Sequence, residues 1–313
     1  MKKLALIAIP LGIGTASAAL TSYTADANTI YLYHFNESSG ATSATNSGTA
    51  GFAAIAFDGN PAANNATNPQ ALNSSILGSS GFSGFGNSAN ISAADLGMGV
   101  DANSSGGFQM GLNGGASPDA VTHGSFASGN GSFSVDAMIQ VSSITGTNRQ
   151  IVSTDNSLGN TARGFQFRLT SGGAMEFNFI GTNTSTSTIA IPTSGTHGFV
   201  ANEWFHVALT FDGATNTSSF YWTRVDAVHT AANLLGVSTN ETVNNSIAGP
   251  IVIGNEGRSF GTGANSTEGL LGRIDEVRIS NVVRGADQFI FVPEPSVTLL
   301  GALGALGLLR RRR

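Results

Sequence analysis

Asp275 is a candidate functional residue, because its predicted position would bury a carboxylate. Strict alternation along its predicted strand places it on the same face as Val277 and Ile279, the apolar side. Charged groups are rarely buried there unless they are paired or bind a metal. One interpretation is a Ca²⁺ ligand that acts with loop carbonyls, because Ca²⁺ takes about six to eight oxygen ligands. The other is a carboxylate held by backbone N–H groups or by Arg273 or Arg278.

Trp204 and His206 form the second candidate site. Both lie on the face of a predicted strand that is opposite its apolar row, which is Phe205, Val207, Leu209 and Phe211. If that face is the concave one of a sheet, the two rings could stack on a sugar, so the pair is a candidate glycan-binding site. The alternative is that both side chains pack against a neighbouring sheet or a covering loop.

The sequence contains no recognisable catalytic constellation. Glycoside hydrolysis needs two carboxyl groups on one face, roughly 5 Å apart in retaining enzymes, whereas the acids here are sparse and mostly isolated in predicted loops. No Gly-x-Ser-x-Gly elbow, His-Glu-x-x-His helix or phosphate loop occurs. The five histidines show no metal-ligand spacing, and the absence of cysteine excludes a disulfide or a thiolate site. The sequence therefore predicts a protein that is not an enzyme.

The distribution of charge argues against a nucleic-acid partner. The chain has 14 basic and 19 acidic residues. Its ends hold six of the basic residues (Lys2, Lys3 and Arg310 to Arg313) and one acid, Glu294, so the remainder carries 8 basic and 18 acidic residues, no lysine and a net charge of −10. Nucleic acids and anionic lipids both require a basic face. Only the C-terminal segment is therefore expected to contact a membrane.

The first eighteen residues have the three parts of a signal peptide. Lys2 and Lys3 give a charged start, Leu4 to Ile13 is apolar, and Ala16-Ser17-Ala18 is a cleavage site of small residues. The alternative is a retained anchor helix, for which the apolar run is short. We expect export, with cleavage after Ala18.

The C-terminus combines Pro293, Glu294 and Pro295 with an apolar run from Val297 to Leu309. Arg310, Arg311, Arg312 and Arg313 follow and would stay cytoplasmic. As a helix the run would reach roughly 20 Å, which is less than the ~30 Å hydrocarbon core of a bilayer. The alternative is an apolar terminus tucked against the domain. The order of the three parts resembles the PEP-CTERM sorting signal over residues 292–313. This resemblance implies transient membrane anchoring, an exosortase that cuts near the Pro-Glu-Pro, and the surface or extracellular matrix of a Gram-negative bacterium.

Between the two ends, a period of two indicates strands joined by Gly- and Asn-rich turns. The clearest predicted strand has Phe133, Val135, Ala137, Ile139 and Val141 on one face and Ser134, Asp136, Met138 and Gln140 on the other, which is typical of a half-buried strand. Further strands are predicted at residues 29–35, 149–153, 164–170, 175–179, 203–211, 218–225, 250–254 and 271–280, with short edge strands between 41 and 131. Such spacing without helical periodicity predicts an all-β sandwich.

Four motifs resemble those of laminin-G-like domains: Tyr33–Gly40, Ala201–Gly213, Ile251–Gly254 and Gly269–Asn281. They imply a concanavalin A-like jelly-roll of two antiparallel sheets over residues 29–291, flanked by hydrophobic helices at the N- and C-termini. The chain departs from the family pattern at Asn36, where Asp is usual, which weakens a metal site inferred from that position. It also lacks the usual Val-Asp-Gly hairpin near residues 218–225.

Together the two resemblances imply an exported surface or matrix protein whose β-sandwich binds polysaccharide or mediates adhesion. Related glucanases carry Glu-x-Asp-x-x-Glu on one strand, and no such spacing occurs here. The alternatives are a divergent glycoside hydrolase or lyase of the same superfamily, and a purely structural coat protein that self-associates.

Overall fold

The computed structural model describes residues 19–59, 71–102, 104, 120–122, 131–154, 165–179, 186–226, 229, 231–239, 248–256 and 268–292. The predicted terminal helices and the seven sorting-signal residues, Pro293 to Pro295 and Arg310 to Arg313, lie outside these ranges. Within the described ranges no helix is long and apolar enough to cross a membrane.

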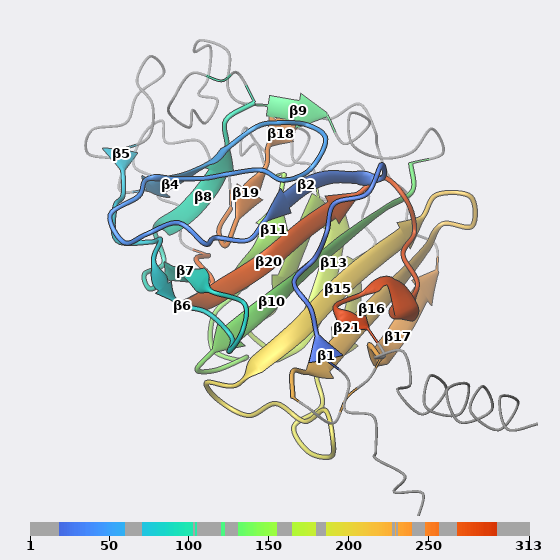
Figure 1. Ribbon diagram of the computed structural model, residues 1–313. Helices are drawn as coiled ribbons and strands as arrows, with labels where there is room; N and C mark the ends of the chain where they lie inside the picture. Colours follow the sequence, from blue (N-terminus) through green and yellow to red (C-terminus); the bar gives the residue numbers. More distant parts are fainter. Residues whose placement is uncertain are drawn as a thin grey trace, which may run out of the picture.

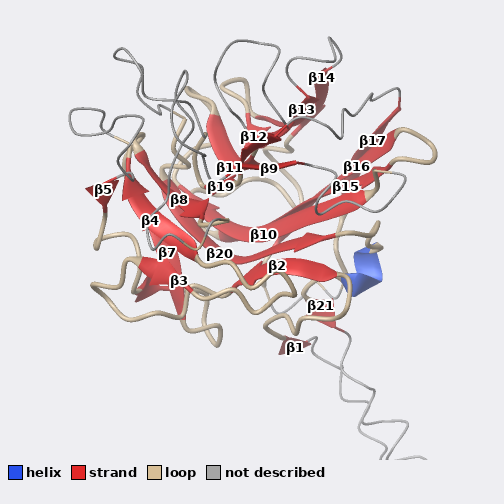
Figure 2. Cartoon of the chain, turned by 90° about the horizontal axis from the view of Figure 1, so that it is seen from above, coloured by secondary structure: helices blue, strands red, loops and turns tan. Residues whose placement is uncertain are grey.

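The described strands form two antiparallel sheets that face each other (Figures 1 and 2). The first, named sheet 1, has the order β17 (Leu234–Thr239), β16 (Thr217–Arg224), β15 (Trp204–Asp212), β10 (Phe133–Val141), β20 (Gly272–Ser280), β7 (Asn87–Ile91) and β6 (Ser79–Ser80), and β2 (Thr29–Tyr33) also pairs with β20. The predicted all-β sandwich of antiparallel sheets is confirmed.

Sheet 2 packs behind sheet 1 and has the order β14 (Thr186–Ala190), β13 (Ala174–Phe179), β12 (Phe165–Leu169), β11 (Arg149–Ser153), β19 (Val252–Ile253), β8 (Leu96–Val100), β4 (Ala54–Asp58) and β3 (Ser43–Ala44), with β5 (Ala71–Leu72) paired to β4. Two small ribbons complete the described strands. They join β18 (Ala248–Pro250) to β9 (Ala120–Thr122), and β1 (Ala19–Leu20) to β21 (Phe291–Val292).

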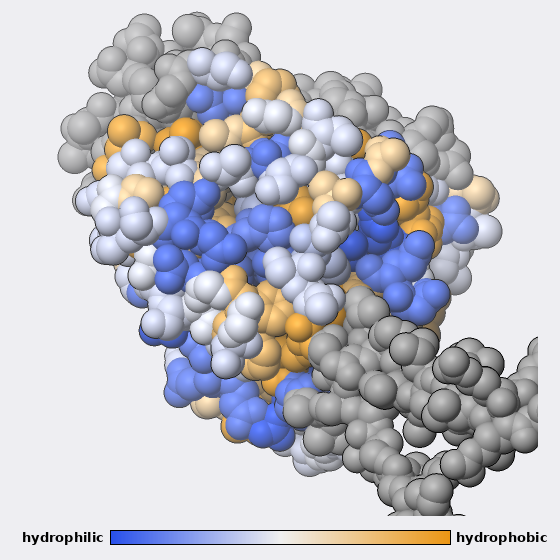
Figure 3. Space-filling model, in the orientation of Figure 1, coloured by the Kyte–Doolittle hydropathy of each residue, from blue (hydrophilic) through white to orange (hydrophobic). Residues whose placement is uncertain are grey.

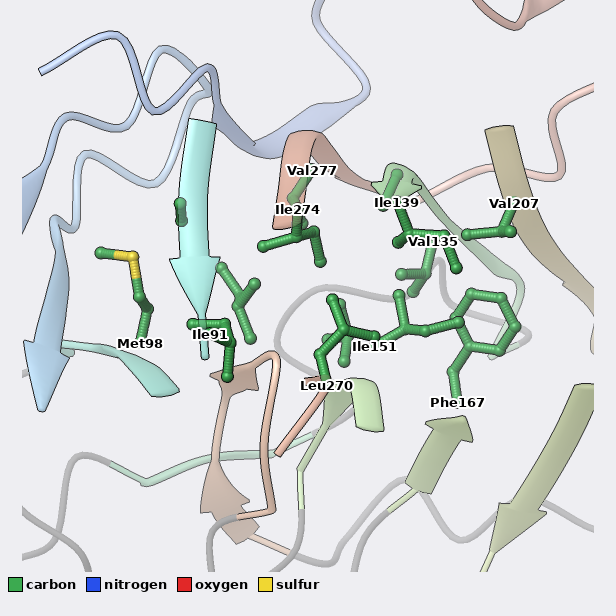
Figure 4. Packing of buried hydrophobic residues seen from close by; sticks show 14 of the residues in the cluster. Ile91, Met98, Val135, Ile139, Ile151, Phe167, Val207, Leu270, Ile274 and Val277 are labelled. Atoms are coloured by element: carbon green, nitrogen blue, oxygen red, sulfur yellow. The ribbon is translucent and has the colours of Figure 1, made fainter. Parts of the chain in front are cut away.

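The main core lies between the sheets, where apolar side chains from both layers point toward one another (Figure 4). The predicted inward rows are confirmed for β10 and β15, because their odd-numbered residues from Phe133 and Phe205 onward all belong to this core. Tyr31 and Tyr33 of β2 face the same core. A ring cluster at its centre joins Phe133 to Phe165, Phe177 and Phe211 with centroids 5.3–5.9 Å apart. Burial of apolar side chains such as these is the main favourable contribution to the stability of the sandwich.

The second face of β10 differs from the prediction of a half-buried strand. Ser134, Asp136 and Met138 are fully buried rather than open to solvent. The chain ends cover them: the Ser134 hydroxyl donates to the carbonyl of Val282 at 2.6 Å and accepts from the backbone N–H of Arg284 at 2.9 Å. Both faces of sheet 1 are therefore buried at its centre.

Residues 19–28 and 281–292, here named the terminal strap, form that cover (Figure 1). Ala19 pairs with Val292 and Leu20 with Phe291. Arg284 forms two parallel hydrogen bonds with Asp26, at 2.8 and 3.0 Å, and also donates to the Ser280 hydroxyl. The folded domain therefore includes residues 19–28, which precede the predicted start at residue 29.

Candidate functional site

Trp204 and His206 lie under the terminal strap on the outer face of sheet 1. The ring of His206 is fully buried, with its centroid 5.0 Å from that of Phe289 and 5.4 Å from that of Phe291. Trp204 is 8% exposed and belongs to the same apolar cluster. Figure 3 shows this side of the molecule, with apolar surface beside a hydrophilic band. The alternative of packing against a covering segment describes both positions, and a sugar could reach His206 only if the strap moved away.

A buried ion pair fixes the polar atoms beneath the strap. The Arg278 Nε donates to Asp136 Oδ2 at 3.0 Å, and the guanidinium stacks 3.7 Å above the centre of the Tyr23 ring. The Tyr23 hydroxyl lies 3.3 Å from His206 Nε2 and accepts from the backbone N–H of Ile290 at 3.1 Å. The strap is therefore attached to sheet 1 by charge-assisted and aromatic contacts as well as by apolar burial.

The pKa shifts of this network follow from its burial and its charges. Burial alone would raise the pKa of Asp136, but the charge of Arg278 and the hydrogen bond of His206 outweigh it and hold that pKa below its usual value. Burial lowers the pKa of His206 although Asp136 opposes the shift. Asp136 is therefore ionised and His206 neutral at pH 7. In the part of the chain that the structure describes, Asp136 and His206 are fully buried and Arg278 is nearly so.

Asp275 lies on the outer face of sheet 1, not on the core face expected from strict alternation. Strand β20 has a β-bulge at Glu276, whose φ is +49°, so that Arg278 pairs with Asp136 while Asp275 pairs with Met138. The extra residue shifts every side chain before it to the other face. Ile274 and Val277 consequently both enter the core, although they are three residues apart.

The carboxyl group of Asp275 is fully buried and only half satisfied. Its Oδ1 accepts from the backbone N–H of Glu276 at 2.8 Å, whereas its Oδ2 has no hydrogen-bond partner. The two arginines suggested as partners bond elsewhere, Arg273 to the carbonyl of Ser80 and Arg278 to Asp136. Burial, and then the charge of Glu276, raise the pKa of Asp275 to about 9.

This raised pKa gives a testable dependence of stability on pH. The unfolded chain releases the Asp275 proton near the ordinary value of 3.8, whereas the folded chain keeps it to about 9. Because the folded state binds more protons across that window, the contribution of Asp275 to stability falls as pH rises from about 4 to about 9. We expect Asp275→Asn to remove this fall, as measured by urea unfolding in chelator at several pH values. An identical pH profile for both proteins would contradict a neutral, buried Asp275.

The surroundings of Asp275 fit an oxygen-bound cation in part. A Cβ placed on Gly81 would lie 2.8 Å from Asp275 Oδ2 and 2.9 Å from the carbonyl oxygens of Gly86 and Asn87, so these three oxygens lie close together beside Gly81. Carboxylate and carbonyl oxygens are the ligands that Ca²⁺ prefers. The described ranges contain no group of three or more His, Cys, Asp or Glu placed to hold one ion, so most ligands would have to be carbonyls.

Sheet 2 carries a second polar centre, named the Arg168 cluster, which consists of Asn148, Gln150, Arg168, Glu176 and Glu268. Core residues alternate with Arg168 on β12 and with Glu176 on β13, so both side chains point to the outer face of the sheet. Arg168 lies 2.7 Å from Glu176 Oε1 and 2.9 Å from Glu268 Oε2. Glu268 also accepts two side-chain hydrogen bonds, one from Gln150 at 2.6 Å and one from Asn148 at 3.2 Å.

The members of the Arg168 cluster hydrogen-bond to one another, and its charged side chains are slightly exposed. The side chains of Arg168, Glu176 and Glu268 are 14%, 9% and 13% exposed. Burial would raise the pKa of Glu268, but Arg168, Asn148 and Gln150 outweigh it and lower that pKa. A glycosidase acid needs a raised pKa. The cluster therefore suits hydrogen bonding to a polar ligand better than proton transfer.

A pocket of about 330 Å³ opens on the same outer face of sheet 2. Its lining residues are Thr42, Ser43, Gly51, Ala53, Ile55, Asp101 and Ser104. Ile55 forms part of a small apolar cluster with Phe57 and Val252 on this face. The lining combines hydroxyl and carboxyl groups with a few small or apolar side chains, so it offers hydrogen bonds to a polar ligand.

Comparison with known families decides what the fold is. A family model of the concanavalin A-like lectin/glucanases superfamily, of the laminin G type, matches residues 113–288, which is more than half of the chain. The chain belongs to this superfamily. A second model, the PEP-CTERM protein-sorting motif, matches residues 291–313 of this concanavalin A-like protein. The motif implies export and sorting through the C-terminus, and both predicted resemblances are confirmed.

Several solved structures are similar to parts of the chain at low identity, and no curated protein matches the sequence. The carbohydrate-binding module CBM40 of the Ruminococcus gnavus IT-sialidase, bound to α2,3-sialyllactose, is 14% identical over 52% of this chain and 82% of its own, with a TM-score of 0.40. A SAP-like pentraxin from Limulus polyphemus is 18% identical over 50% and 67%, with a TM-score of 0.37. The botulinum neurotoxin serotype D binding domain is 16% identical over 86% and 52%, with a TM-score of 0.48.

The Arg168 cluster was missed in the sequence because its members come from four separate segments. The alternation of Phe165, Phe167 and Leu169 does place Arg168 on the outer face. Its opposition to Glu176 depends on the register of the β12–β13 hairpin, which the Gly172–Gly173 turn sets. Arg168 and Glu176 carry opposite charges and lie at equal distances from that turn, and this spacing was the available signal for their pairing.

Proposed function

We propose that this chain is an exported, non-catalytic glycan-binding or adhesion protein of the bacterial surface or extracellular matrix. The observation that carries the proposal is the Arg168 cluster, a hydrogen-bonded set of amide, guanidinium and carboxylate groups whose charged members are slightly exposed on the outer face of sheet 2. Such groups pair with sugar hydroxyls, and pre-formed hydrogen-bonding groups bind at a small entropic cost. The hydroxyl-lined pocket on the same face supports the proposal.

The charge of the site favours neutral or amino sugars over acidic polysaccharides. One arginine stands between two carboxylates, and the body of the chain carries a net charge of −10. Like charges across an interface are unfavourable, so uronates and sulfated glycans should bind more weakly. A glycan array probed with the purified exported chain tests the function. Binding to neutral or amino-sugar polymers is expected, and no binding to any polysaccharide, with or without calcium, would overturn the proposal.

The terminal strap gives the sorting signal a defined exit from the domain. Ala19, the first residue after the predicted signal peptide, pairs with Val292, the residue before Pro293. Both membrane-directed sequences therefore leave the domain at one ribbon. In this proposal an exosortase-type enzyme of a Gram-negative bacterium cuts near the Pro-Glu-Pro and passes the folded domain to the cell surface.

Calcium at Asp275 belongs to the same proposal. The ion would be held by Asp275 with the carbonyls of Gly86 and Asn87, and it would link β20 to the loop between β6 and β7. We expect the thermal midpoint to rise when Ca²⁺ is added to chelator-treated protein and not to rise in Asp275→Asn. An unchanged midpoint in the natural protein would remove calcium from the account.

A structural coat protein is the second candidate, and strand β17 favours it. This strand ends sheet 1, carries no charge, and exposes Leu234 by 50% and Val237 by 49%. Edge strands of monomeric proteins are commonly protected by charges or proline. Light scattering separates the candidates, because a coat protein self-associates without sugar and Val237→Lys would dissolve the assembly.

The glycanase alternative predicts release of reducing sugar, abolished by Glu268→Gln.

A further inference from the structure

Two histidines that are 32 positions apart in the sequence meet beside sheet 1. His197 lies in the loop between β14 and β15, and His229 lies in the loop between β16 and β17. Their ring centroids are 4.3 Å apart with an angle of 45° between the planes. The indole N–H of Trp222 donates to the carbonyl of His197 at 3.0 Å, which fixes the first loop against the core.

Each ring has a nitrogen that is buried and lacks a hydrogen-bond partner. These atoms are His197 Nδ1 and His229 Nε2. A buried polar atom without a partner costs about 1–3 kcal/mol. The two rings are neighbours, so one ligand that contacts both atoms would restore the missing interactions.

Asp226 leaves the lone pair of His229 Nε2 available to bind a metal. Its Oδ1 lies 2.6 Å from His229 Nδ1 and accepts from the backbone N–H of His229 at 3.0 Å. A carboxylate at Nδ1 retains the proton on that nitrogen, so the lone pair of Nε2 remains available. This carboxylate–imidazole pair is the usual support of a metal-bound histidine.

His197 is also suited to donate a lone pair. Its Nδ1 is buried and has no hydrogen-bond partner, so no other described group occupies this nitrogen. Imidazole nitrogen is preferred by Zn²⁺, Cu²⁺ and Ni²⁺, whereas Ca²⁺ prefers oxygen.

We propose that His197 and His229 bind one late first-row divalent cation, with Asp226 as the positioning residue and water in the remaining coordination positions. No third His, Cys, Asp or Glu joins them among the residues that the structure describes. The protein would therefore leave coordination positions of the ion to water. The site is also distinct from the oxygen-rich surroundings of Asp275. The bound ion would cross-link the loops that precede β15 and follow β16.

Titration of the chelator-treated full chain with Zn²⁺, against a metallochromic dye, tests this proposal. We expect one equivalent of Zn²⁺ to bind and to raise the thermal midpoint, and Ca²⁺ not to compete. His197→Gln and His229→Gln should each abolish this binding, and Asp226→Asn should weaken it by about 10-fold or more. His34→Gln is the matched control, because His34 lies 2.8 Å from Glu276 and is remote in sequence from both loops.

Circular dichroism of each variant confirms that it is folded before its binding is compared. Equal Zn²⁺ binding by the natural chain and the folded His197→Gln/His229→Gln double variant would overturn the proposal. So would the absence of bound Zn²⁺ at 100 µM, since water alone would then satisfy the two nitrogens. Loss of binding in both single variants with full binding in His34→Gln would support it.

Discussion

Arg278→Met should lower the free energy of unfolding by about 3–5 kcal/mol. The substitution keeps much of the side-chain volume but leaves the Asp136 carboxylate buried without its cationic partner, and it removes the stacking on Tyr23. It also frees the carbonyl of Gln288, which accepts from Arg278 at 3.0 Å. Urea unfolding at pH 7 measures the loss.

Two further variants separate the ion pair from simple loss of an arginine. Arg273→Met, on the same strand, removes only a partly exposed contact with the carbonyl of Ser80 and should cost less than about 1 kcal/mol. Asp136→Asn combined with Arg278→Met should recover part of the loss, because no unpaired charge remains. Equal effects of the Arg278 and Arg273 variants would contradict the buried ion pair.

Removal of residues 19–28 should destabilise the domain by about 5 kcal/mol or more. The deletion exposes the apolar cluster that contains Trp204 and Phe289. It also removes Asp26, which pairs with Arg284, and Tyr23, which stacks on Arg278. We also expect faster proteolysis of residues 281–292, because β21 loses its paired strand. Thermal melts and limited proteolysis measure the two effects.

Substitutions at Tyr23 divide this effect between packing and hydrogen bonds. Tyr23→Phe keeps the ring over Arg278 but loses the bond from Ile290, so it should cost about 1 kcal/mol. Tyr23→Ala should cost about 3–5 kcal/mol. If the deleted protein melts like the natural one, residues 19–28 are not part of the folded domain.

Alternation was sufficient to predict the inward rows of sheet 1 because strands β10 and β15 are long and regular. It failed at Asp275 because a bulge adds one residue, and Glu276 bears no sequence mark of its positive φ. A bulge depends on how the neighbouring strands pair, and that pairing is not visible along a single strand.

The first half of the chain was harder to predict because small residues replace the apolar pattern there. Strand β8, Leu-Gly-Met-Gly-Val, lies inside sheet 2 rather than at an edge. A Cβ on Gly97 would come within 2.7 Å of the Phe57 ring and 2.8 Å of Asn255. Glycine is required there by close packing, and the same glycine weakens the strand signal.

The terminal strap gave no signal because its contacts are made between the two ends of the chain. Residues 19–28 contain neither an apolar period nor a turn motif that would link Asp26 to Arg284. The docking of these residues also buries Trp204 and His206. Alternation along β15 predicts which face of the sheet the two side chains occupy, but it does not predict that another segment covers that face.

The central claim is that glycans bind at the Arg168 cluster and not at Trp204 and His206. Calorimetric titration with the tightest ligand from the array, using the natural chain and folded variants, tests it most directly. We predict that Arg168→Gln and Glu268→Gln each weaken binding by about 10-fold or more, as expected for lost charge-assisted hydrogen bonds, and that Arg273→Gln and Trp204→Phe bind like the natural chain. Unchanged affinity in both cluster variants, with loss of binding in Trp204→Phe, would contradict the account.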